Sequence, residues 1–301
     1  MTSFRRWMVV AAVVGAVLAL MSSAAGAAVP QARWYWTMAV SPTNPAVLVL
    51  GTNAGLYRSQ NGGKTWHPTG PSNLNATSLV RVGNTIFAGG VVESPMGPAT
   101  LTVHGQYIVP SGQGVLETST NGGSTWRQLH PSGLPGLAVQ ALATDPASTD
   151  SLYAELKNGA VYSSTDGGKS FRLVTHKVGG TPWALAVTQP GHLVAGDMTT
   201  GNFLSADATH WLDTGFTDPQ KGKMVMEYAV QPTDTSHVLM SSYGVVSSTD
   251  GGKTWRSSLA SKVMFGPVAF AASTPKVAYA VGFDGSLWRT GNAGTSWAKV
   301  G

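Results

Sequence analysis

The sequence contains no cysteine, which excludes disulfide bonds and a lipid anchor on an amino-terminal cysteine. Charged residues make up only 11% of the chain, and its lysines and arginines are scattered rather than clustered. Because a nucleic-acid surface needs grouped basic side chains, nucleic acid is not an expected partner. A chain of this length without disulfides must be held together by an apolar core, and it is long enough to bury a large one.

The amino-terminal segment reads as a secretory signal peptide over residues 1–28. Arg5 and Arg6 precede an apolar run over 9–21, and small residues suited to cleavage follow it. This predicts an extracytoplasmic protein, secreted or on the cell surface, with residues 29–301 as the folded part. The apolar stretch can also be extended at both ends, so an uncleaved membrane anchor stays open as the alternative.

One phrase, Ser-x-Asp/Asn-Gly-Gly-x-Thr-Trp, occurs six times after this segment. Clean copies span 59–66, 119–126, 164–171 and 248–255, and altered copies span 205–211 and 290–297. The closing aromatic residues are separated by 60, 45, 40, 44 and 42 residues. A period near 40–45 residues with short strand signals between the copies is typical of a radial β array.

Each repeat carries four strand signals, and segments with helical periodicity are missing after the signal segment. We therefore expect an all-β protein, a single six-bladed β-propeller of four-stranded antiparallel blades and a monomer. The predicted blades cover about residues 33–70, 73–130, 137–175, 182–214, 225–260 and 265–301.

The repeated phrase is expected to form the hairpin loop between the third and fourth strands of each blade. Its Asp or Asn accepts backbone N–H groups, its glycines supply positive φ, and its aromatic residue returns to the core. A ligand or calcium loop is the alternative, but identical loops on every blade cannot converge on one site. The expected structural residues are Ser59, Asn61, Gly63, Trp66, Ser119, Asn121, Gly123, Trp126, Ser164, Asp166, Gly168, Phe171, Ser205, Asp207, Trp211, Ser248, Asp250, Gly252, Trp255, Asn292, Gly294 and Trp297.

These residues resemble the BNR or Asp-box repeat of sialidase-like propellers, over nearly all of residues 33–301. In style the repeats are most similar to sortilin-like receptors, photosystem II assembly-type propellers and xyloglucanase-type glycoside hydrolases. The motif is specific for the fold and carries little information on function. The receptor and assembly-factor resemblance implies a protein or peptide ligand and no catalytic residues.

True sialidase activity is not expected. The resemblance would imply three arginines around a substrate carboxylate and an Arg-Ile-Pro motif, which this sequence lacks. After the signal segment, only Arg33 and Arg81 lie away from the boxes. A xyloglucanase-type enzyme would need a second propeller for which the chain has no room.

Binding is expected on the face opposite the boxes, where other loops surround the channel. An insertion over 93–111 enlarges the second repeat there, and it supplies His104 and Tyr107 as binding candidates. The insertion is interpreted either as a partner-binding finger or as a tolerated surface loop. If it is a finger, deleting residues 95–110 should keep the fold and weaken binding of the partner.

Four more binding candidates are expected around the channel, namely Trp36, Gln140, Trp183 and Tyr228. The aromatic rings of Trp36, Trp183 and Tyr228 could stack on a sugar or anchor a peptide, or they could pack in the channel or between blades. The favoured function is a non-catalytic module that binds a protein or a glycan.

The alternative is a carbohydrate-active hydrolase using two carboxylates, with Glu227 and Asp197 as weak candidates. Glu227 is one of four glutamates and interrupts an apolar strand. The seven histidines show no metal-ligand spacing, so no metal and no cofactor are expected.

Overall fold

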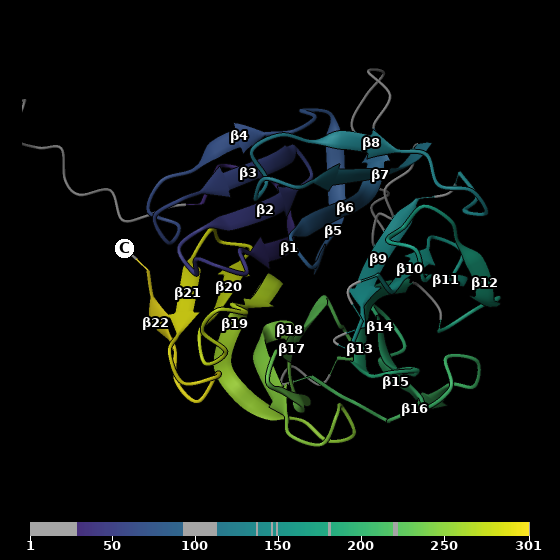
Figure 1. The fold of residues 1–301 in the computed structure, drawn as a ribbon. Coiled ribbons are helices and arrows are strands. Elements are labelled where there is room, and N and C mark those ends of the chain that lie inside the picture. The colour runs from purple at the N-terminus through teal and green to yellow at the C-terminus, as the bar shows by residue number, and fades with distance from the viewer. Residues whose placement is uncertain are drawn as a thin grey trace, which may run out of the picture.

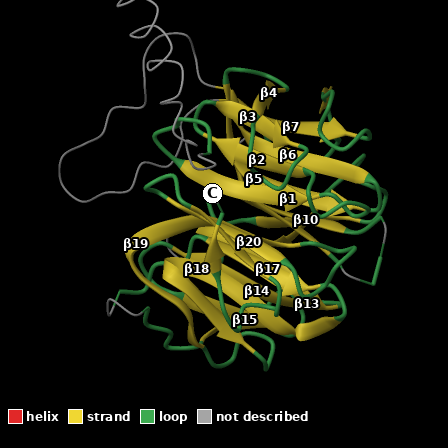
Figure 2. Ribbon diagram, turned by 90° about the vertical axis from the view of Figure 1, so that its left-hand side faces the viewer, coloured by secondary structure: helices red, strands yellow, loops and turns green. Residues whose placement is uncertain are grey.

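The computed structural model describes residues 29–92, 113–136, 138–145, 147–148, 150–179, 182–218 and 222–300. The predicted signal segment 1–28 and the insertion 93–111 lie outside these residues. The described part consists of strands joined by turns and loops (Figure 2). It contains no helix long and apolar enough to cross a membrane.

Four of the sheets are blades of four antiparallel strands, in sequence order from the channel outward. The first holds β1 (Tyr35–Val40), β2 (Leu48–Thr52), β3 (Gly55–Ser59) and β4 (His67–Thr69). The second holds β5 (Leu74–Val82), β6 (Thr85–Val92), β7 (Gln113–Ser119) and β8 (Arg127–Leu129). The third holds β9 (Val139–Thr144), β10 (Leu152–Leu156), β11 (Val161–Ser164) and β12 (Arg172–Thr175). The fourth holds β13 (Pro182–Gln189), β14 (His192–Asp197), β15 (Asn202–Ser205) and β16 (Leu212–Asp213).

The prediction of six separate four-stranded blades is wrong. The last two repeats share one six-stranded sheet, so the structure has four four-stranded blades and this larger sheet. The larger sheet holds β17 (Glu227–Gln231), β18 (Asp234–Ser248), β19 (Arg256–Phe270), β20 (Ala278–Gly282), β21 (Leu287–Thr290) and β22 (Ala298–Lys299). The residues 256–265 contain neither glycine nor proline, so nothing ends β19 at the predicted blade boundary.

The sheets stand side by side around a central axis (Figure 1), and the ring closes where β19 lies against β1. The strands that face this axis are β1, β5, β9, β13, β17 and the second half of β19, and we call them the inner strands. Apolar side chains fill the spaces between neighbouring sheets. Leu48 and Leu50 of β2, for example, are fully buried against the last strands of the chain.

In the box loops, backbone amides donate hydrogen bonds to side-chain oxygens of the same loop. In the first copy the amide of Gly63 donates to Oγ of Ser59 at 2.9 Å, and the amide of Thr65 donates to Oδ1 of Asn61 at 2.9 Å. The indole N–H of Trp66 donates to the carbonyl of Gly63 at 3.0 Å. In this copy the indole, the serine hydroxyl and the asparagine side chain are therefore all hydrogen-bonded within the loop itself.

The boxes also hold neighbouring repeats together. The hydroxyl of Thr69 donates to the carbonyl of Gly123 at 2.6 Å, and the hydroxyl of Ser258 donates to that of Gly294 at 2.5 Å. Four boxes donate a hydrogen bond to the turn that follows an inner strand, as when the amide of Gly62 donates to the carbonyl of Ala46. The boxes and these turns thus define one end of the channel, which we call the box end.

Candidate functional site

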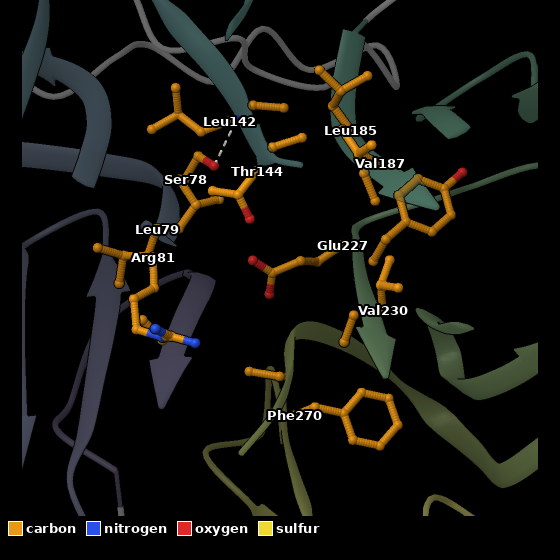
Figure 3. Close-up of a pocket in the computed structure, with 18 of the residues that line it drawn as sticks. Ser78, Leu79, Arg81, Leu142, Thr144, Leu185, Val187, Glu227, Val230 and Phe270 are labelled. Carbon is orange, nitrogen blue, oxygen red and sulfur yellow. Dashed lines mark hydrogen bonds between the residues drawn. The ribbon is translucent and has the colours of Figure 1, made fainter. Parts of the chain in front are cut away.

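A cavity of about 490 Å³ occupies the box end of the channel. All six inner strands line it, and it reaches the turns that follow them, at Gly83, Ala147 and Pro232. Its wall is about equally polar and apolar. Figure 3 shows both kinds of side chain, the apolar Leu142, Leu185, Val187, Val230 and Phe270 and the polar Ser78, Arg81, Thr144 and Glu227. The size falls in the usual range for ligand pockets.

The other end of the channel is filled by aromatic and methionine side chains. Trp36, Trp183, Met198, Met224 and Met226 form one buried cluster, with Trp34, Met264 and Phe283 packed on it. The rings of Trp36 and Trp183 meet edge to face with centroids 5.0 Å apart. Trp183 and Met226 also line the cavity. This cluster is therefore the floor of the cavity, and we call it the tryptophan–methionine floor.

Glu227 points its carboxyl group into the cavity (Figure 3) and joins three parts of the ring. Its Oε1 accepts a hydrogen bond from the hydroxyl of Thr37 on β1 at 2.5 Å, and its Oε2 accepts one from the amide of Val268 on β19 at 2.9 Å. We call these three residues the ring latch. Burial raises the pKa of Glu227 well above its usual range, although the hydrogen bonds from Thr37, Val268 and Met38 oppose the rise.

Two further contacts of this kind join neighbouring inner strands. The amide of Leu79 on β5 donates to Oγ1 of Thr37 at 2.9 Å, and the amide of Leu142 on β9 donates to Oγ of Ser78 at 2.8 Å. Neighbouring inner strands belong to different ladders, so side chains must satisfy these amides. The latch is consequently part of a hydrogen-bond path that runs from β17 through β1 to β5.

The aromatic binding candidates are packed inside the ring. Trp36 and Trp183 are only 7% and 4% exposed, and the indole of Trp36 donates to Oδ1 of Asn75 at 2.7 Å. Tyr228 is buried between sheets, where its hydroxyl donates to Oδ1 of Asn202 at 2.6 Å. Within the described residues these rings thus contribute to packing, and of the three residues Trp183 and Tyr228 also line the cavity.

The remaining candidates are separated from the cavity or lie outside the description. Gln140 is buried on β9, and neither polar atom of its amide has a hydrogen-bond partner among the described residues. Asp197 ends β14 and accepts the amides of Thr199 at 2.5 Å and Thr200 at 2.7 Å. His104 and Tyr107 lie outside the described residues.

The acidic pair proposed for hydrolysis is not brought together in the cavity. Glu227 lines it, whereas Asp197 does not. Asp197 instead lies close enough to Glu155, a buried residue of β10, to repel its negative charge. Burial, and to a smaller extent this repulsion, raise the pKa of Glu155 well above its usual range. Across the described residues, no three histidine, aspartate or glutamate side chains gather in a way that could hold a metal ion.

Replacing Glu155 with glutamine should make the stability of the folded protein less sensitive to a rise in pH from about 5 to about 8. Because the pKa of Glu155 is higher in the folded than in the unfolded chain, native stability falls as pH rises above the unfolded value of 4.5. We expect urea midpoints of the native protein to drop more between about pH 5 and about pH 8 than those of Glu155→Gln. The exposed Asp150→Asn is the control, and equal slopes for all three proteins would contradict the expectation.

Arg81 on β5 lines the cavity, although its sequence position indicated only that it lies away from the boxes. Its guanidinium donates to the carbonyl of Gly83, and burial lowers its pKa. Among the described residues the single acid–base side-chain contact within ion-pair distance joins His210 to Asp207, so no carboxylate is paired with Arg81. The latch partner Thr37 was missed too, although Thr37 and Glu227 each stand five residues before a turn proline, Pro42 and Pro232.

Comparison with solved structures gives the same fold at low sequence identity. YCF48 bound to D1 peptide has a TM-score of 0.54 and 19% identity, covering 91% of this chain and 82% of that one. YCF48 from Cyanidioschyzon merolae has a TM-score of 0.53 and 14% identity, covering 92% and 88%. A GH74 enzyme of Niastella koreensis has a TM-score of 0.43 and 14% identity, covering 87% and 49%. No curated protein matches the chain.

Two family models match the sequence. The BNR/Asp-box repeat matches residues 57–68, within the first repeat. The model described as photosynthesis system II assembly factor YCF48 matches residues 99–299. The predicted secreted or cell-surface location is wrong, because the matched model describes an assembly factor of photosynthesis system II. Because the second match spans most of the chain, this protein belongs to the YCF48 family of photosystem II assembly factors.

Proposed function

We propose that this chain is a non-catalytic assembly factor that binds a segment of a protein partner at the box end of its channel. The observation that carries the proposal is the match of the assembly-factor family over residues 99–299. The related YCF48 in complex with a D1 peptide supports a peptide as the ligand class. The cavity supports the location, because it is large enough for a few side chains and is bounded by a stiff ring.

The chemistry of the cavity favours binding over hydrolysis. A glycoside hydrolase needs two carboxyl groups on either side of the bond that it cleaves. Of the two candidates, Asp197 is engaged by the turn at Thr199 and Thr200, away from the cavity lining. The carboxyl group of Asp145, which does line the cavity, accepts the amide of Ala147 at 2.8 Å within its own turn. Glu227 is thus left without a second catalytic acid.

Site-specific photo-cross-linking in the source cells tests this proposal. A photoreactive residue at Ala147 or at Pro232, both on the cavity rim, should yield a discrete adduct with another polypeptide. The same residue at Leu173 or Leu212, exposed on outer strands, serves as the matched control and should not. Absence of a rim adduct, or the same adduct from the control positions, would overturn the proposal.

A further inference from the structure

The cavity admits an occupant from one end. The tryptophan–methionine floor closes it below, and the rim at the box end is formed by turns. The wall between them combines apolar side chains, such as Val230, with polar ones, such as Thr144 and Arg81, and the carboxyl group of Glu227 points into the space between them (Figure 3). An occupant that fits must therefore be slender, with apolar atoms along part of its length and a polar leading end.

The carboxyl group of Glu227 has no opposite charge beside it in the described structure. The one ion pair there lies elsewhere, and no lysine, arginine or histidine shifts the pKa of Glu227. Thr37, Val268 and Met38 each supply one hydrogen bond, whereas an ionised carboxylate has about four acceptor positions, so about one position is left for a further donor. A cationic group reaching the cavity would find unused acceptor capacity in surroundings where water competes weakly.

We propose that the cavity takes the basic side chain of a lysine or arginine from the protein partner, with its charged group on Glu227. The aliphatic stem of such a side chain would lie along the apolar side chains of the wall, and its head would meet the carboxylate above the floor. This inference rests on the proposed function, since it names the residue type by which the partner segment is recognised.

Arg81 adds a second element to this recognition. It lines the same cavity, and no carboxylate is paired with it among the described residues. A second cation beside it would be repelled, whereas an acidic residue next to the inserted basic one would be attracted. The segment that fits best therefore carries a basic residue with an acidic neighbour.

The test uses the full chain and two small probes, Nα-acetyl-lysine amide and its uncharged Nε-acetyl derivative, titrated by ligand-observed NMR. The charged probe should bind at least about tenfold more tightly than the uncharged one. Glu227→Gln should bring the charged probe to the affinity of the uncharged one, because the amide keeps the volume and loses the charge. Arg289→Gln, on the exposed face of β21, is the control and should change neither affinity.

A second variant covers the case in which Glu227→Gln does not fold. Val230→Phe narrows the cavity without touching the ring latch, and it should abolish binding of both probes. Equal binding of the two probes, or binding unaltered by either folded variant, would overturn the inference. If the rim cross-links to a polypeptide but the charged probe binds no better than the uncharged one, the proposed function stands and the inference about a basic side chain fails. If the charged probe is preferred but the rim gives no cross-link, the cavity binds a cationic group and the proposal of a protein partner fails.

Discussion

Replacing Gly266 with alanine should unfold the protein at markedly lower urea concentrations. A Cβ added at this position would lie 1.9 Å from the carbonyl oxygen of Tyr35 on β1, where β19 closes the ring. The contact is with backbone, so no side-chain rotation relieves it, and one of the two strands must move. We expect a loss of about 3 kcal/mol in the free energy of unfolding, at the upper end for overpacked sites.

Gly136→Ala is the matched control for this experiment. An added Cβ there would meet nothing within 4 Å. Its stability should stay within about 0.5 kcal/mol of the native protein. If both alanine variants have the same urea midpoint, the close approach of β19 and β1 does not determine stability.

Removing the indole of Trp183 should have an effect of similar or greater size. The side chain is 4% exposed and packs against Trp36 and the methionines of the floor. Its truncation to alanine loses buried apolar area and leaves a void, which costs about 3–5 kcal/mol for aromatic residues in a core. Thermal and urea unfolding of Trp183→Ala measure this loss directly.

Leu212→Ala provides the comparison, because the Leu212 side chain is 69% exposed and its removal leaves no void. A change of less than about 0.5 kcal/mol is expected for it. Should Trp183→Ala behave like Leu212→Ala, the floor would be loosely packed and the cavity would not have a fixed depth.

The repeat period was sufficient to predict a propeller, because the box and its flanking strand signals recur throughout the chain. It was insufficient for the sheet count. The boundary expected at about 260–265 depended on a break in the backbone, and the continuous β19 shows that spacing between boxes does not require one. Pairing between strands is set by the closed ring, which local sequence signals do not describe.

The sequence identified Glu227 through its position in an apolar strand, but not what the residue does. One of its hydrogen-bond donors is the backbone amide of Val268, and every residue except proline has such an amide. A second donor, Thr37, lies 190 residues away and meets Glu227 only because the ring closes. Trp36 and Trp183 were identified from their places at the start of inner strands, whereas their role in packing depended on neighbours from other repeats.

The tryptophan–methionine floor makes the channel a well with a single opening. A segment that enters at the box end must leave by the same end. While it is bound, a competing segment cannot enter the cavity, and none can displace it from the end closed by the floor. Residence time would then be governed by how fast the segment withdraws past the turns at the rim. A partner protein could thread only an end or a protruding side chain into this ring, never a continuous chain through it.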